Sequence, residues 1–109
     1  MQTITTETLF ERTTAAGLPE GYVRTLIEAG ALDGAVTPGH RIRPHGLAAI
    51  LLVDELARLR LDGRITREEA AAVYQTLAPE LPDLIDKGGG PVTVRAGRRR
   101  IKLDFLRRM

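Results

Sequence analysis

The side chains best suited to binding chemistry in this chain are arginines, and three of the stretches that contain them stand out. Arg24 lies in a short segment with an apolar pattern, Arg41 and Arg43 lie in a loop, and residues 91–109 are strongly basic. A guanidinium group is always charged, and its fork of N–H donors fits a phosphate or the edge of a guanine. These positions therefore indicate recognition of an anionic partner, with nucleic acid as the first candidate.

The sequence offers little for catalysis. It has no cysteine, which excludes disulfides, thiolate metal sites and cysteine nucleophiles. His40 and His45 share one loop without carboxylate or cysteine support, which is a weak pattern for a metal site. No paired carboxylates and no nucleophile with a base gather around any loop. We therefore predict no enzyme, no cofactor and no metal, with His40 as a phosphate contact and His45 as a helix-start residue.

The charges of the chain are unevenly distributed. Residues 1–90 carry 9 Lys and Arg against 13 Asp and Glu, a net −4, whereas residues 91–109 carry 7 against 1, a net +6. A basic terminal segment on a mildly acidic body is a common sign of nucleic-acid contact. It equally fits an arm that docks on the acidic body of a second copy, and a merely solvated tail is a third interpretation.

Composition places the chain among ordinary soluble single domains. It has 109 residues, of which 43% are hydrophobic and 28% charged. No apolar run has transmembrane length, and the start lacks the pattern of a secretory signal. We expect a cytoplasmic protein without a membrane partner.

The segment around which the rest is organised is residues 17–32, GLPEGYVRTLIEAGAL. Pro19 suits the first position of a helix, and Gly30 can end the helix in the left-handed conformation. Val23, Leu26 and Ile27 recur at i, i+3 and i+4, so they share one apolar face. Because so short a helix is marginal alone, another helix must support it. The pattern predicts a helix-turn-helix with this helix presented to solvent.

A Gly- and Pro-rich stretch, residues 33–46, follows that helix. Val36 and Ile42 could sit on two short strands around Pro38 and Gly39, with His40, Arg41 and Arg43 near the tip. A hairpin in this position is a wing, and its arginines can pair with phosphates or enter a minor groove. The alternative is that they are simply exposed loop arginines.

Three further helices are expected. The first covers about residues 7–15, with Thr6 as its N-cap and Phe10 as a core anchor. Residues 47–61 form the most apolar helix and should be the buried centre of the core. A capping box over Thr66 and Glu69 starts the last helix, which Pro79 ends.

The end of the chain reads as a linker followed by a β-hairpin. Residues 79–90 include a possible helical turn and then three consecutive glycines. Residues 91–109 alternate, and Ala96-Gly97 is the expected turn. A lone hairpin is barely stable, so it must lie on its own domain or pair with another chain. We predict pairing into a homodimer through the apolar positions, which are Val92, Val94, Ile101, Leu103 and Phe105.

The predicted fold is mostly α with a small β part: a winged helix-turn-helix of about four helices over residues 1–78, a linker, and a C-terminal β-hairpin. The order helix, turn, GLPEGYVRTLIEAGAL, GHRIRPHG and LAAILLVDELARLRLDGRITREEAAAV resembles the winged-helix domain of MerR-type regulators over roughly residues 3–77. Gly17 at the turn, Arg24 on the second helix and Gly30 at its end carry the likeness.

The resemblance implies binding of double-stranded DNA. Its second helix would approach the major groove through Glu20, Tyr22, Arg24 and Thr25, and its wing would contact backbone and minor groove through His40, Arg41 and Arg43. Two departures stand out: Thr25 and Leu26 replace the usual aromatic pair, and a basic hairpin replaces the long dimerisation helix and effector domain.

Three function classes follow. The first is a small sequence-specific DNA-binding transcription regulator, repressor or excisionase-like, acting as a dimer. The second is a MerR-like adaptor or modulator that binds a protein partner instead of DNA, because Glu11, Glu20 and Glu28 surround the predicted reading surface. A third, weaker resemblance links LIEAGALD to helix-hairpin-helix segments of replicative polymerases.

Overall fold

The computed structural model describes residues 2–109 and is mostly helical, with one small antiparallel sheet. Its elements, in chain order, are α1 (Thr6–Ala15), α2 (Glu20–Glu28), α3 (Pro44–Leu61), α4 (Arg67–Leu77), η1 (Ala78–Glu80), α5 (Leu81–Asp86), β1 (Val92–Ala96), β2 (Arg99–Leu103) and η2 (Phe105–Arg108). The helix η1 and the helix η2 are short 3₁₀ turns.

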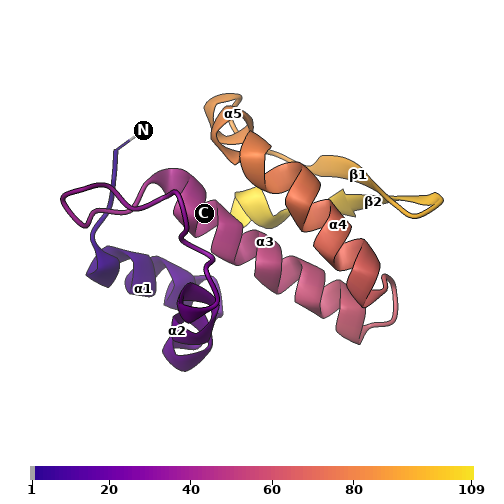
Figure 1. The fold of residues 1–109 in the computed structure, drawn as a ribbon, viewed down its shortest axis with the longest axis horizontal. Coiled ribbons are helices and arrows are strands. Elements are labelled where there is room, and N and C mark those ends of the chain that lie inside the picture. Colours follow the sequence, from indigo (N-terminus) through magenta and orange to yellow (C-terminus); the bar gives the residue numbers. More distant parts are fainter. Residues whose placement is uncertain (1) are drawn as a thin grey trace.

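Helix α3 runs through the middle of the molecule, as its apolar sequence predicted. Figure 1 shows α1 and α2 on one side of it, and α4, α5 and the sheet on the other. Residues along its whole circumference are buried, including Leu47, Ile50, Leu51 and Leu52. One continuous core therefore joins both sides of the molecule through α3.

The helix boundaries follow local capping chemistry. Thr5, one residue before the predicted Thr6, is the N-cap of α1 and accepts a hydrogen bond from the backbone N–H of Thr8. Pro19 is the N-cap of α2 and not its first residue. The predicted capping box of α4 is confirmed, since Thr66 and Glu69 each accept a hydrogen bond from the other's backbone N–H.

The loop between α2 and α3 is less regular than the predicted strand pair. Val36 and Ile42 form a single antiparallel bridge, and Ile42 forms a second bridge with Ile4 near the N-terminus. Ile42 is buried, whereas Val36 is 45% exposed. Ile42 therefore ties the start of the chain and this loop together without forming a regular strand with either.

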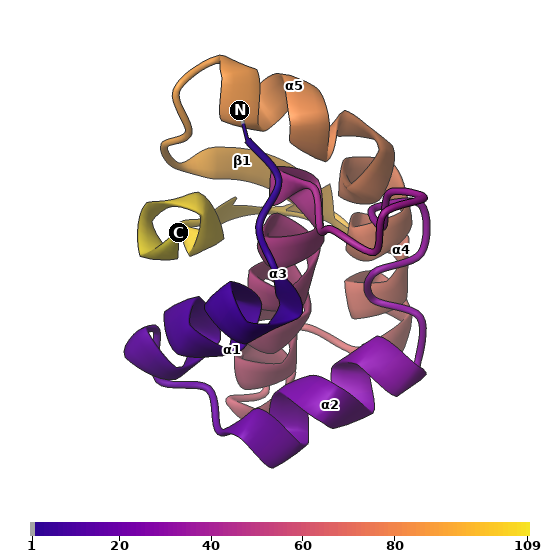
Figure 2. The same cartoon turned by 90° about the vertical axis from the view of Figure 1, so that its left-hand side faces the viewer.

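The C-terminal hairpin packs against the helices of the same chain. β1 pairs antiparallel with β2, and the two residues between them are Gly97 and Arg98, one step beyond the predicted Ala96-Gly97 turn. Gly97 takes φ +63, a left-handed conformation in which a residue with a side chain would be strained. β1 packs against α4 and η2 packs against α3. Figure 2 shows the C-terminal turn beside α3 and β1 beneath α5.

A buried carboxylate fixes the last turn of the chain. Arg108 donates to Asp54 Oδ2 at 2.9 Å and to the backbone oxygen of Ala16 at 2.6 Å. Arg58 also contacts Asp54 Oδ2, at 3.0 Å. Asp54 is buried on α3, and Ala16 directly follows α1. These bonds therefore join the C-terminus to both α3 and the end of α1.

Candidate nucleic-acid interface

Arg24, the predicted reading residue of α2, is exposed but already has partners within the chain. Its Nε lies 3.1 Å from Glu20 Oε2, one helical turn earlier. Its guanidinium carbon lies 4.7 Å from the centre of the Phe10 ring, which is a cation–π distance. A DNA contact by Arg24 would have to replace or share these two interactions.

The surface around Arg24 is acidic. A hollow of about 680 Å³ is lined by residues of α1 and α2, including Glu7, Phe10, Glu11, Glu20 and Arg24. We call this the acidic α1–α2 surface. Three carboxylates near one arginine give a field that opposes a phosphate backbone.

The other predicted residues of α2 point in different directions. Thr25 is exposed, and its hydroxyl donates to the backbone oxygen of Gly21 at 3.0 Å. Tyr22 is half-buried and turned toward α3, where burial first and then the nearby carboxylate of Asp54 raise its pKa. Tyr22 therefore contributes to packing, whereas Glu20, Arg24 and Thr25 share the exposed side.

The loop between α2 and α3 presents only part of its predicted set. Arg41 donates from Nε to Thr3 Oγ1 at 2.7 Å and from a terminal nitrogen to Thr3 O at 3.0 Å. His40 is exposed at the tip with φ +61. Arg43 is exposed and forms the N-cap position of α3. Of the three, Arg41 holds the N-terminal segment, while His40 and Arg43 face solvent.

The largest group of unengaged cations lies on the hairpin. Arg95 stands directly opposite Arg100, Lys102 stands opposite Thr93, and Arg98 occupies the turn. All four cations are exposed, and none of them takes part in an ion pair within residues 2–109. We call Arg95, Arg98, Arg100 and Lys102 the basic hairpin face.

The opposite face of the hairpin packs on the protein's own core, so this chain itself covers two of the residues predicted to form the dimer contact. Leu103 and Phe105 are fully buried, and Phe105 belongs to η2 and not to a strand. Val92, Val94 and Ile101 are partly buried against the same core. Leu103 and Phe105 are therefore unavailable to a second copy, while dimerisation itself stays a prediction.

One further contact aligns the hairpin with α4. Arg99, on the packed face, lies 3.4 Å from Glu69 Oε1, the carboxylate of the capping box. The hydrogen bond from the Thr66 backbone, assisted by Arg99, lowers the pKa of Glu69. This contact therefore joins the turn end of the hairpin to the N-terminus of α4.

Sequence reasoning missed one site and two pairings. The spacing of Glu20 and Arg24 at i and i+4 was a readable signal for their ion pair. The contact between Arg108 and Asp54 joins residues 54 positions apart and has no local signal in the sequence. The missed site is an apolar groove on α3, which is described below.

Three further features bear on the function of the chain, namely metal-binding groups, membrane-spanning helices and known relatives. Within residues 2–109, no three His, Asp or Glu side chains come close enough to hold a metal ion. No helix in that range is both long and apolar enough to cross a membrane. Comparison with protein families, with curated proteins and with solved structures finds no match for this chain.

Proposed function

We propose that this chain is a small double-stranded-DNA-binding protein of the winged helix-turn-helix type, acting as a transcription regulator. The observation that carries the proposal is the basic hairpin face, four exposed cations with no acidic partner in the part of the chain that the structure describes. The order of α1, α2, the following loop and α3 supports the winged-helix part of the proposal.

The placement of these cations has no structural benefit of its own. Arg95 and Arg100 are directly opposed across the two strands, and like charges in that position destabilise a sheet. Residues two apart on one face of a strand are about 6.7 Å apart, which is twice the axial spacing of phosphates along one DNA strand. A phosphate backbone would turn this repulsion into attraction.

The basic hairpin face supplies affinity in this proposal, and α2 supplies base contacts. Phosphate contacts position a protein, whereas side chains at base edges specify the sequence. His40 and Arg43 are the loop residues free to add to the phosphate contacts. Two copies on symmetric half-sites would give the sequence specificity of a regulator.

The test is the salt dependence of DNA binding. We expect the quadruple glutamine variant of the basic hairpin face to bind a DNA duplex more weakly, with a slope of log affinity against log salt shallower by about 3.6. The duplex is taken from the region upstream of the gene, and a random duplex serves as the non-specific reference.

A variant with the same loss of charge elsewhere is the control. Arg95→Gln with Arg100→Gln should reduce the slope by about 1.8, whereas Arg12→Gln with Arg64→Gln should leave it nearly unchanged. Arg12 and Arg64 are exposed and also lie outside the ion pairs of residues 2–109. Absence of binding by the unaltered protein at low salt would reject the proposal.

The second candidate function is a protein-binding adaptor on the same scaffold. It is favoured by the acidic α1–α2 surface, where a DNA-reading helix would need cations. A lack of DNA binding at low salt would favour this candidate.

A further inference from the structure

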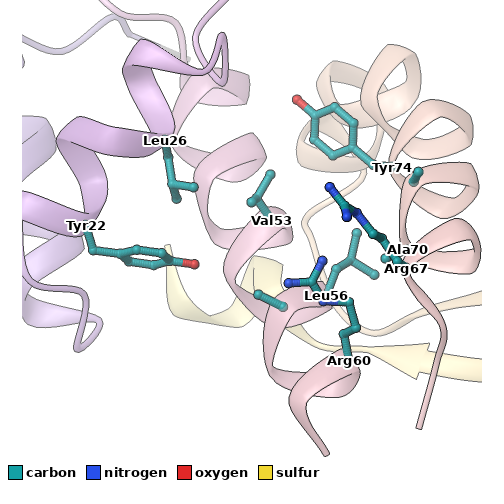
Figure 3. A pocket seen from close by; sticks show the side chains of 10 residues that line it. Tyr22, Leu26, Val53, Leu56, Arg60, Arg67, Ala70 and Tyr74 are labelled. Atoms are coloured by element: carbon teal, nitrogen blue, oxygen red, sulfur yellow. The ribbon is translucent and has the colours of Figure 1, made fainter. Parts of the chain in front are cut away.

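An apolar groove runs along α3 between α2 and α4. Its volume is about 460 Å³, and its floor is formed by Val53, Leu56 and Ala57 of α3. Figure 3 shows Tyr22 and Leu26 on one wall and Ala70 and Tyr74 on the other. This lining is far more apolar than the acidic α1–α2 surface, and none of it belongs to the basic hairpin face.

The groove continues beyond this volume. A second hollow of about 170 Å³ shares Leu26, Val53 and Tyr74 with the first and extends past Ala29 and Ala31. Together they form a trough and not a closed cavity. A trough of this kind fits an elongated apolar object better than a compact one.

The arrangement of the three helices suggests the shape of that object. α2 and α4 each pack against α3 and flank the trough from opposite sides. A fourth helix laid along α3 between them would complete a four-helix arrangement. The alanines of the floor and wall let the backbone of such a helix approach closely.

Two arginines give the trough a charge preference. Arg60 of α3 and Arg67 of α4 extend over its apolar lining, as Figure 3 shows. Neither takes part in an ion pair within residues 2–109. An occupant that covers the apolar floor would also cover these guanidinium groups, so it needs carboxylates at that end.

We propose that the groove lined by Leu26, Val53, Leu56, Ala70 and Tyr74 binds an amphipathic helix of a partner protein, with carboxylates that pair with Arg60 and Arg67. Apolar side chains of the partner at i, i+3, i+4 and i+7 fill the trough. This surface would allow the protein to contact a second protein while the basic hairpin face contacts DNA, and it does not depend on DNA binding.

The probe is a synthetic amphipathic peptide of about four helical turns, with leucines along one face and two glutamates at one end of that face. Its control is the same peptide with lysine in place of both glutamates. Amide shifts of the full chain are followed by NMR during titration. We expect the acidic peptide to shift residues around Leu26, Val53 and Ala70, and the lysine peptide to bind at least about tenfold more weakly.

Charge reversal in the protein tests the same contact from the other side. We expect Arg60→Glu with Arg67→Glu to exchange the preference, so that the lysine peptide binds more tightly than the acidic one. Reversal of Arg12 and Arg64, which lie outside the groove lining, should leave the original preference intact. Circular dichroism of each variant checks that the helices remain folded.

Three results would overturn the proposal. The first is that neither peptide shifts the groove residues at millimolar concentration. The second is that the acidic peptide shifts the residues of the basic hairpin face instead. In the third, groove shifts depend on protein concentration without peptide, which would assign the trough to a second copy of this chain.

Discussion

The acidic α1–α2 surface and the basic hairpin face both carry exposed arginines, but only the second leaves them free. On the first, Arg24 contacts Glu20 and the Phe10 ring. On the second, Arg95 faces another arginine, Arg100, and no carboxylate is paired with either within residues 2–109. The cations of the basic hairpin face are therefore available to an anionic partner as they stand, whereas Arg24 must first leave or share its contacts with Glu20 and Phe10.

The geometry of helix and strand explains the difference. On α2, residues four apart lie side by side, so Glu20 comes next to Arg24. On the hairpin, alternate residues share a face, so Arg100 and Lys102 lie on the same face of β2. The strand register places Arg95 directly opposite Arg100. The single acid within residues 91–109, Asp104, is paired with Arg107 beyond the strands.

The comparison depends on the hairpin being part of the core, and Phe105 gives the strongest test. The side chain is fully buried between the C-terminal turn and the rest of the core. We expect Phe105→Ala to lower the free energy of unfolding by about 3–5 kcal/mol, because a large buried ring leaves a cavity. Urea denaturation measures the loss.

Lys102→Ala on the basic hairpin face is the control and should change the free energy of unfolding by less than about 0.5 kcal/mol. A loss below 1 kcal/mol for Phe105→Ala would mean that the hairpin is only loosely attached. The basic hairpin face would then be a mobile arm, and its comparison with the helices would fail.

The second prediction concerns the contact of Arg108 with buried Asp54. Arg108→Met leaves the Ala16 oxygen without this donor and Asp54 Oδ2 with Arg58 as its remaining ion-pair partner, so we expect a loss of about 1–3 kcal/mol of unfolding free energy. Arg107→Met is the matched control, because Arg107 is 80% exposed in its pair with Asp104. That change should cost between about 0 and 1 kcal/mol. Equal losses would show that Arg108 acts only as a surface charge.

Much of the fold could be predicted because its signals are local. The apolar run of α3, the capping box at Thr66 and the alternation of the hairpin each depend on residues close in sequence. The sequence predicts the start of α3 at residue 47, three residues late, because Pro44 and Gly46 indicate a loop. Pro44 suits a helix start, and a Cβ on Gly46 would lie 2.9 Å from Ile42, so the glycine serves close packing.

The site was harder to predict because it depends on contacts between distant segments. Arg41 bonds to Thr3, 38 residues away, and Arg108 bonds to Asp54, 54 residues away. Nothing in the spacing of these residues indicates their pairing. The alternation of β2 likewise predicted an apolar face, but not whether this chain or a second copy would cover Leu103.

The third prediction concerns the capping box that aligns the hairpin with α4. Thr66→Ala removes the side-chain cap and should cost about 1 kcal/mol in thermal or urea unfolding. The folded state lowers the pKa of Glu69, so its stabilisation is present above the ordinary value of 4.5 and is lost as pH falls below it. Glu69→Gln should remove this part of the pH dependence. If Glu69→Gln leaves the loss of stability at acidic pH unchanged, Glu69 is not held by Thr66 in solution.

The smallest expected effect would show whether α2 takes part in DNA binding at all. Glu20→Gln removes the ion-pair partner of Arg24 and one negative charge from the acidic α1–α2 surface. If α2 approaches DNA, we expect affinity to rise by up to about 1 kcal/mol and the salt slope to steepen by up to about 1, since a freed arginine can replace one more counterion.

Glu28→Gln, on the same helix and outside the ion pairs of residues 2–109, makes the same change in net charge and should have less effect. Arg24→Ala in the Glu20→Gln background should then cancel the gain, and more strongly on the specific duplex than on the random one if Arg24 reaches a base edge. Identical behaviour of the two glutamine variants would take α2 out of the proposed DNA contact and would remove its reading role.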